Sequence, residues 1–304
     1  MIYTLTLNPS VDLIISLERF IEGRVNLSDN EYKLPGGKGI NVSQVMKNLG
    51  HNSMALGFIG GFTGKFIGDE LKKKQVESDF VEVTGDTRIN IKMKDSAAES
   101  EINGNSPEIS KENLEELLEK LKELKKDDIL VMSGSVPKTL PESIYREILE
   151  SIETGVKVVV DTKGEALAEA VKGKPFMVKP NNHELEDMFD VKIEDQEDII
   201  KYGKKLVEMG AENVIVSMAG NGALLISQEG IYFGNVPRGT LINSVGAGDS
   251  LVGGFTAGLV EGLTITESFK KGIASGSASA FSENLCTVEE VEELLGEIKI
   301  RKIY

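Results

Sequence analysis

Near its carboxyl end the chain contains Asn243-Ser244-Val245-Gly246-Ala247-Gly248-Asp249-Ser250, a glycine-rich turn that leads into an apolar segment. Apolar residues follow Asp249 at spacings of three and four, which predicts a helix that begins at this turn. The first turn of a helix has unpaired backbone N–H groups and a partial positive charge. The turn is therefore suited to bind an anion, and phosphate is the usual one.

Asp249 is an unusual neighbour for a bound phosphate, because two anions repel each other. The residue makes chemical sense if its carboxylate takes a proton from a hydroxyl group that attacks the phosphate. A tight turn followed by an acidic first helical turn explains the same residues equally well. The small residues Gly253, Gly254, Ala257 and Gly258 also predict that this helix packs closely against a neighbour.

The composition limits the classes to which the protein can belong. The 304 residues, 40% of them hydrophobic, suffice for one large α/β domain. A net charge of −15 argues against nucleic acid and anionic membranes as partners. Cys286, the single cysteine, suits a reducing compartment, and no apolar run approaches the roughly 20 residues that span a bilayer. No signal peptide is apparent, so we expect a cytoplasmic protein.

Strand-like and helix-like segments alternate along most of the chain. The expected strands are 1–7, 56–61, 129–133, 157–161, 176–179 and 214–218, followed by a hairpin of 223–227 and 231–236. The expected helices are 40–49, 64–74, 111–126, 141–153, 165–171, 183–188, 197–209, 249–259, 265–281 and 288–295. This alternation predicts an α/β fold with a doubly wound, mainly parallel sheet and helices on both faces. Ligands of such sheets bind at the carboxyl ends of the strands.

Residues 10–34 and 87–103 depart from this alternation, because they contain several strand-like runs with little helix between them. The expected strands are 11–17, 24–27, 31–34, 87–94 and 100–103, with a turn at 28–30. In the run 87–94, apolar residues alternate with Arg88, Asn90, Lys92 and Lys94, which therefore share one face. We expect a small second sheet within a single domain that spans residues 1–304.

Several cations of this acidic chain lie where a phosphorylated substrate would need them. Lys38 lies in the glycine-rich loop 35–39, which leads into the helix 40–49, while Arg24, Arg88 and Lys92 lie on the small sheet. Phosphate favours paired cationic donors. Taken singly, Arg24 and Lys92 are more simply explained as solubilising residues on an exposed strand.

Two further loops follow expected strands of the main sheet. Asn181 and Glu184, at a spacing of three, share one face of a helix. An amide and a carboxylate suit a hydrated magnesium ion, although a helix cap with an acidic first turn explains them equally well. The small-residue turn 217–222 can hold a nucleotide phosphate or form a plain hairpin.

Taken together, these segments resemble the ribokinase-like (PfkB-type) sugar kinases over essentially the whole chain. Both signatures of that family are present, at 36–43 and at 243–254, in the expected order. The similarity is greatest to the hexose-phosphate branch, through the segments 6–12, 87–90, 101–104 and 133–137. The resemblance implies a doubly wound α/β domain, a small β-sheet lid formed by about 10–34 and 87–103, and the use of ATP and Mg²⁺.

The resemblance also assigns roles to individual residues. Asp249 would be the catalytic base, and Gly246, Ala247 and Gly248, together with the N–H of Asp249 itself, would form the anion hole. The sugar phosphate would contact Asp12, Gly37, Lys38, Asn41, Arg88, Asn103, Ser135 and Asp249. ATP would lie on Ser217, Gly220, Gly222, Gly248 and Asn181, and Mg²⁺ would be held through water by Asn181 and Glu184.

We therefore expect ATP-dependent phosphorylation of fructose 1-phosphate at its C6 hydroxyl. Tagatose 6-phosphate is the alternative acceptor, and a non-catalytic sugar-phosphate sensor on the same scaffold is the alternative from another class. Asn243-Ser244 replaces the Asp-Thr that many relatives carry near a monovalent-cation site, so the resemblance leaves K⁺ dependence open. Partly apolar faces of the lid favour a homodimer formed through it, although packing against the main domain explains them as well.

Overall fold

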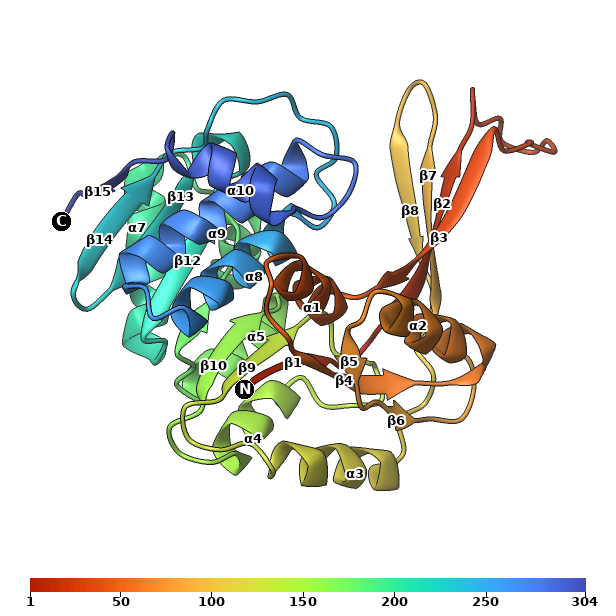
Figure 1. The fold of residues 1–304 in the computed structure, drawn as a ribbon, viewed down its shortest axis with the longest axis horizontal. Coiled ribbons are helices and arrows are strands. Elements are labelled where there is room, and N and C mark those ends of the chain that lie inside the picture. Colours follow the sequence, from red (N-terminus) through yellow and green to blue (C-terminus); the bar gives the residue numbers. More distant parts are fainter.

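A computed structural model describes all residues from 1 to 304 and contains two sheets (Figure 1). The main sheet has 11 strands in the order β15-β14-β13-β12-β11-β10-β9-β1-β4-β5, and β6 also pairs with β4. The strands from β12 to β5 pair in parallel, and β13, β14 and β15 add an antiparallel edge. Their bounds are β1 Ile2–Thr6, β4 Met54–Ile59, β5 Glu77–Ser78, β6 Val81–Glu82, β9 Ile129–Ser133, β10 Lys157–Asp161, β11 Met177–Val178, β12 Asn213–Ser217, β13 Ala223–Ser227, β14 Gly230–Gly234 and β15 Ile300–Lys302.

Helices cover both faces of this sheet, as the sequence predicts. One face carries α1 (Lys38–Asn48), α8 (Ala247–Val260), α9 (Ile265–Ala280) and α10 (Val288–Leu295). The other carries α3 (Lys111–Leu121), α4 (Ile144–Ser151), α5 (Gly164–Lys172), α6 (Asn182–Phe189) and α7 (Gln196–Met209). Alternate residues of β9 belong to the two cores, because successive side chains of a strand point to opposite faces. None of the helices is long and apolar enough to cross a membrane.

The expected small second sheet is present and stands beside α2 (Gly61–Lys73), away from the main sheet (Figure 1). We call it the lid. Its four strands have the order β3-β2-β7-β8, with β2 and β7 parallel. Their bounds are β2 Ser10–Ser16, β3 Asn30–Gly36, β7 Ile89–Lys94 and β8 Glu99–Asn103.

The prediction of a strand at 24–27 is wrong, because the structure has no strand there. Val25 and Leu27 are exposed, and the Asn26 side chain instead closes a turn by bonding to the backbone of Ile21 and Arg24. The bonds of the Asn26 side chain hold these residues in a turn, so they do not join the free edge of β3, the outermost strand of the second sheet.

Candidate active site

The start of α8 lies at the carboxyl edge of the main sheet and forms an anion cradle. Gly246 caps the helix with a φ of 81°, a left-handed conformation that favours glycine. The first helical hydrogen bond is donated by the Ser250 N–H to the Gly246 carbonyl oxygen at 2.8 Å. The N–H groups of Gly248 and Asp249 have no acceptor in the protein. Two free amides at a helix start fit a phosphate oxygen.

Asp249 lies beside these amides and is held by a side chain from α1. The Asn41 Nδ2 donates a hydrogen bond to the Asp249 Oδ2 at 2.8 Å. Burial raises the pKa of Asp249 above its ordinary value, and Asp161 adds to this effect, although Lys38, Asn41 and Lys179 favour the charged form. A desolvated carboxylate with a raised pKa is a better proton acceptor than an exposed one.

Close packing of α8 on α1 brings Asn41 and Asp249 together. A side-chain carbon at Gly253 would lie 2.5 Å from the Val45 Cγ1, so only glycine allows this approach. This confirms the close packing that the small residues of the helix predict. On α1, the cap residue Gly37 has a φ of 123° and passes next to Thr6, where a side chain would not fit.

A cluster of three charges lies next to the cradle, with Asp161 and Lys179 buried and Lys38 partly exposed. The Asp161 carboxylate lies 3.1 Å from the Lys38 Nζ and 3.2 Å from the Lys179 Nζ. A side-chain carbon at Gly248 would lie 3.5 Å from the Lys179 Nζ, so this ammonium group faces the start of α8. The cluster carries one net positive charge beside the two free amides, which strengthens the site for an anion.

The charges of this cluster shift the pKa values of Asp161 and Lys38. Burial works against the charged form of Asp161, but Lys179 and Lys38 outweigh it and hold the pKa of Asp161 below its ordinary value. Burial likewise opposes the charge of Lys38, yet Asp161, Asp249 and Glu184 raise the pKa of Lys38 above its ordinary value. Asp161 and Lys38 are therefore both charged at neutral pH.

Sequence reasoning missed Asp161 and Lys179. A signal was present, because each charged residue ends or directly follows a buried apolar strand, β10 and β11 respectively. Such positions lie at the carboxyl edge of a parallel sheet, where ligands bind.

The base of the lid contributes a second group of polar contacts. Arg88 donates hydrogen bonds to the carbonyl oxygens of Asn8 at 2.9 Å and Pro9 at 3.4 Å. The Asp12 Oδ1 accepts hydrogen bonds from the Ser10 hydroxyl at 2.7 Å and the Asn90 Nδ2 at 3.2 Å. These contacts fix the orientation of two predicted sugar-phosphate ligands, Arg88 and Asp12.

Two other predicted ligands, Ser135 and Asn103, lie near the same group. The Ser135 hydroxyl accepts a hydrogen bond from the Asn8 Nδ2 at 3.1 Å. Asn103 is exposed on β8, opposite Asn90 of β7. Both side chains retain polar atoms that a ligand can contact.

The predicted nucleotide residues Asn181 and Ser217 are paired across the ends of β11 and β12. Gly220 lies in a short 3₁₀ turn, and Gly222 follows it with a φ of 98°. This turn therefore lies at the same edge of the sheet as Asn181.

Asn181 and Glu184 form a reciprocal cap at the start of α6. The Asn181 Oδ1 accepts from the Glu184 N–H at 2.8 Å, and the Glu184 Oε2 accepts from the Asn181 N–H at 2.9 Å. The predicted helix cap is thus present. The second carboxylate oxygen of Glu184 can still accept a hydrogen bond from a metal-bound water. No group of three or more His, Cys, Asp or Glu side chains could hold a metal ion directly. A pair of this kind fits Mg²⁺, which usually keeps several waters.

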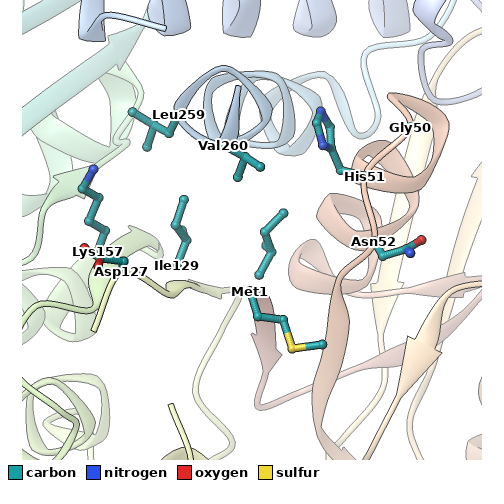
Figure 2. A pocket seen from close by; sticks show the side chains of 10 residues that line it. Met1, Gly50, His51, Asn52, Asp127, Ile129, Lys157, Leu259 and Val260 are labelled. Carbon is teal, nitrogen blue, oxygen red and sulfur yellow. The ribbon is translucent and has the colours of Figure 1, made fainter. Parts of the chain in front are cut away.

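A separate hollow of about 420 Å³ opens at the opposite edge of the sheet (Figure 2). Ile129, Lys157, Leu259 and Val260 are among its lining residues. Ile129 and Lys157 begin their strands, so the hollow lies at the amino edge and contains none of the predicted site residues. We place the active site at the carboxyl edge, because the free amides and Asp249 lie there.

Residues 5–291 match the model of the pfkB family carbohydrate kinases. The chain belongs to this family. It is 52% identical to the 1-phosphofructokinase of Bacillus subtilis and 33% identical to a tagatose-6-phosphate kinase of Staphylococcus epidermidis, over the full length of each. Its fold matches the tetrameric inhibited form of phosphofructokinase-2 from Escherichia coli with a TM-score of 0.90, at 29% identity and covering 97% of this chain and 98% of that one. The kinase family inferred from the two sequence signatures is confirmed.

Proposed function

We propose that this kinase transfers the γ-phosphate of ATP to the C6 hydroxyl of fructose 1-phosphate and forms fructose 1,6-bisphosphate. The observation that carries the proposal is Asp249, held by Asn41 at 2.8 Å directly beside two free backbone amides. A pure anion binder gains nothing from a carboxylate there, whereas a kinase needs a base next to the phosphoryl group. The 52% identity to a 1-phosphofructokinase favours fructose 1-phosphate as the acceptor.

In this mechanism Asp249 accepts the proton of the C6 hydroxyl as that oxygen attacks the γ-phosphorus of ATP. The amides of Gly248 and Asp249 donate hydrogen bonds to the transferred group, and Lys38 adds positive charge. Phosphoryl transfer depends mainly on positioning and charge neutralisation, which these groups supply. Mg²⁺, held through water by Asn181 and Glu184, would neutralise charge on the ATP phosphates. Closure of the lid would keep water from becoming the acceptor.

The remaining predicted ligands would divide between the two substrates. The sugar phosphate would contact Asp12, Gly37, Lys38, Asn41, Arg88, Asn103 and Ser135, next to the base. ATP would lie along Ser217, Gly220, Gly222 and Asn181, with its γ-phosphate at Gly246, Ala247 and Gly248. We propose a cytoplasmic location for the enzyme, which should be recovered in the cytoplasmic fraction of its cell.

Turnover by the purified enzyme on three acceptors tests the proposed function. We expect the largest kcat/KM with fructose 1-phosphate, and smaller values with tagatose 6-phosphate and fructose 6-phosphate. A larger value with tagatose 6-phosphate would establish the alternative acceptor, and no ATP consumption with any sugar would indicate a sensor. Chelation of divalent metal should abolish turnover, and assays with and without K⁺ would settle the role of that ion.

We also propose that two copies associate through the lid. Ile89 and Ile102 lie on the apolar face of the lid and are exposed. The exposed fraction of Ile102 is 62%. Exposed apolar residues on one sheet face favour burial against a second copy. Replacing Ile102 with glutamate should shift the mass measured by sedimentation at micromolar concentration from dimer toward monomer. If the Ile102→Glu variant remained a dimer, the interface would lie elsewhere on the molecule. Lys94→Glu, on the polar face of the lid, is the control and should leave the mass unchanged.

A further inference from the structure

Lys92 lies on the polar face of β7, in the row of side chains that contains Arg88 and Asn90. Residues two apart on a strand point to the same side and lie roughly 7 Å from each other. The Lys92 Nζ lies 3.0 Å from the Asp12 Oδ2, and the two side chains are only 22% and 13% exposed. The interpretation of Lys92 as a solubilising residue on an exposed strand is therefore wrong.

Asp12 is the carboxylate that interacts with the cations at the base of the lid. Asp12 has its Oδ1 bonded to Ser10 and Asn90 and its Oδ2 paired with Lys92, and it also interacts electrostatically with Arg88. Arg88 and Lys92 thus both lie beside the Asp12 carboxylate, while Glu101, opposite Lys92 on β8, is exposed and forms no ion pair with it. Lys92 has three N–H donors and forms an ion pair with Asp12 alone. A cation with unused donors suits a phosphate group.

In the proposed function, the orientation of the sugar would bring its own phosphate toward Lys92. If the C6 hydroxyl lies at Asp249, the C1 phosphate lies at the opposite end of the hexose and away from the cradle. Arg88 is tied to the backbone carbonyls of Asn8 and Pro9, so it forms the floor of this region. Lys92 lies four residues farther along the same face and can move from Asp12 to an incoming phosphate.

We propose that Lys92 binds the phosphate group that the sugar substrate already carries, and that Asp12 holds Lys92 in place until the sugar arrives. The inference rests on the proposed function, because it names the group that recognises the acceptor. Lys92 then selects phosphorylated over unphosphorylated hexose, while Asp249 and the cradle perform the transfer.

Replacing Lys92 with glutamine tests the proposal through binding and turnover. Calorimetric titration with fructose 1-phosphate, without ATP, should show an affinity at least about tenfold lower than that of the wild type, the usual effect of losing one charge-assisted hydrogen bond. In turnover assays KM for fructose 1-phosphate should rise by a similar factor, and kcat should change less than about threefold. Arginine at position 92 should restore most of the affinity.

Two comparisons separate phosphate binding from a structural role. Unphosphorylated fructose, assayed at high concentration, should give the same kcat/KM with K92Q as with the wild type, whereas a lysine that only orients Asp12 would affect both sugars equally. Lys94→Gln is the matched control, because Lys94 shares the strand face but is 62% exposed, and it should change neither sugar.

Three outcomes would overturn the proposal. An unchanged affinity of K92Q for fructose 1-phosphate would do so, as would equal losses for both sugars. Failure of wild-type enzyme to bind or phosphorylate fructose 1-phosphate would instead overturn the proposed function and with it this inference.

Discussion

Replacing Asp249 with asparagine is expected to lower kcat on fructose 1-phosphate by roughly 10²–10⁴-fold, the usual contribution of a positioned general base. Asparagine preserves the shape of the side chain and can still accept the hydrogen bond from Asn41. The affinity for ATP should stay nearly unchanged, because the backbone amides of the cradle are retained. Steady-state kinetics together with calorimetric titration of ATP measures both effects. A loss of less than about tenfold would show that Asp249 is not the base.

The stability of D249N distinguishes lost chemistry from lost folding. Burial raises the pKa of Asp249 in the folded protein. A carboxyl whose pKa is higher folded than unfolded opposes folding at every pH above its unfolded value, because the folded state disfavours the charge. The asparagine variant should therefore be at least as stable as the wild type at neutral pH, as measured by urea denaturation.

The same pKa predicts the acid limb of the wild-type pH profile. The base must be deprotonated, so kcat/KM should fall as the pH decreases through the pKa of Asp249. That midpoint should lie above about 3.9, the ordinary value for aspartate, and the limb should disappear in the residual activity of D249N.

Replacing Asp161 with asparagine is expected to lower the free energy of unfolding by about 3–5 kcal/mol, the usual result of removing one partner from a buried ion pair. Asp161 is 0% exposed, and its loss leaves Lys179 buried without its counterion. Guanidinium denaturation at neutral pH measures the change. Because the pKa of Asp161 is depressed in the folded state, its stabilisation is present above the unfolded pKa and is lost as the pH falls through the folded value.

A surface pair provides the matched control for D161N. Glu115 pairs with Lys111 at 3.3 Å on α3, where both side chains are exposed. Glu115→Gln should change the free energy of unfolding by less than about 0.5 kcal/mol. A change of less than about 1 kcal/mol in D161N would contradict the view that Asp161 is the counterion on which the cluster depends. The double variant D161N/K179M should recover part of the loss, because it removes the unpaired charge.

Local patterns in the sequence were sufficient for the architecture. Regular alternation of strand-like and helix-like runs predicts the doubly wound sheet. The spacing of apolar residues in each run shows whether it is a strand or a helix and which side of it is buried. The bounds of β9 and β10 agree with the expected ranges 129–133 and 157–161. The glycines at 246 and 248 likewise indicated the helix start and its free amides, since these are properties of a single segment. The strand expected at 24–27 failed because the Asn26 side chain bonds to nearby backbone groups and closes a turn, which competes with strand formation.

Tertiary structure decided which charged groups act on one another. Asp161 and Lys38 are 123 residues apart, and Asn41 and Asp249 are 208 apart, yet each pair is in hydrogen-bond contact. Lys92 looked like a surface residue in the sequence and proved to be the counterion of Asp12. The physical reason is that a charge takes its energy and its pKa from what surrounds it in space. Those surroundings exist only once α1, α8 and the lid have packed around the carboxyl edge of the sheet.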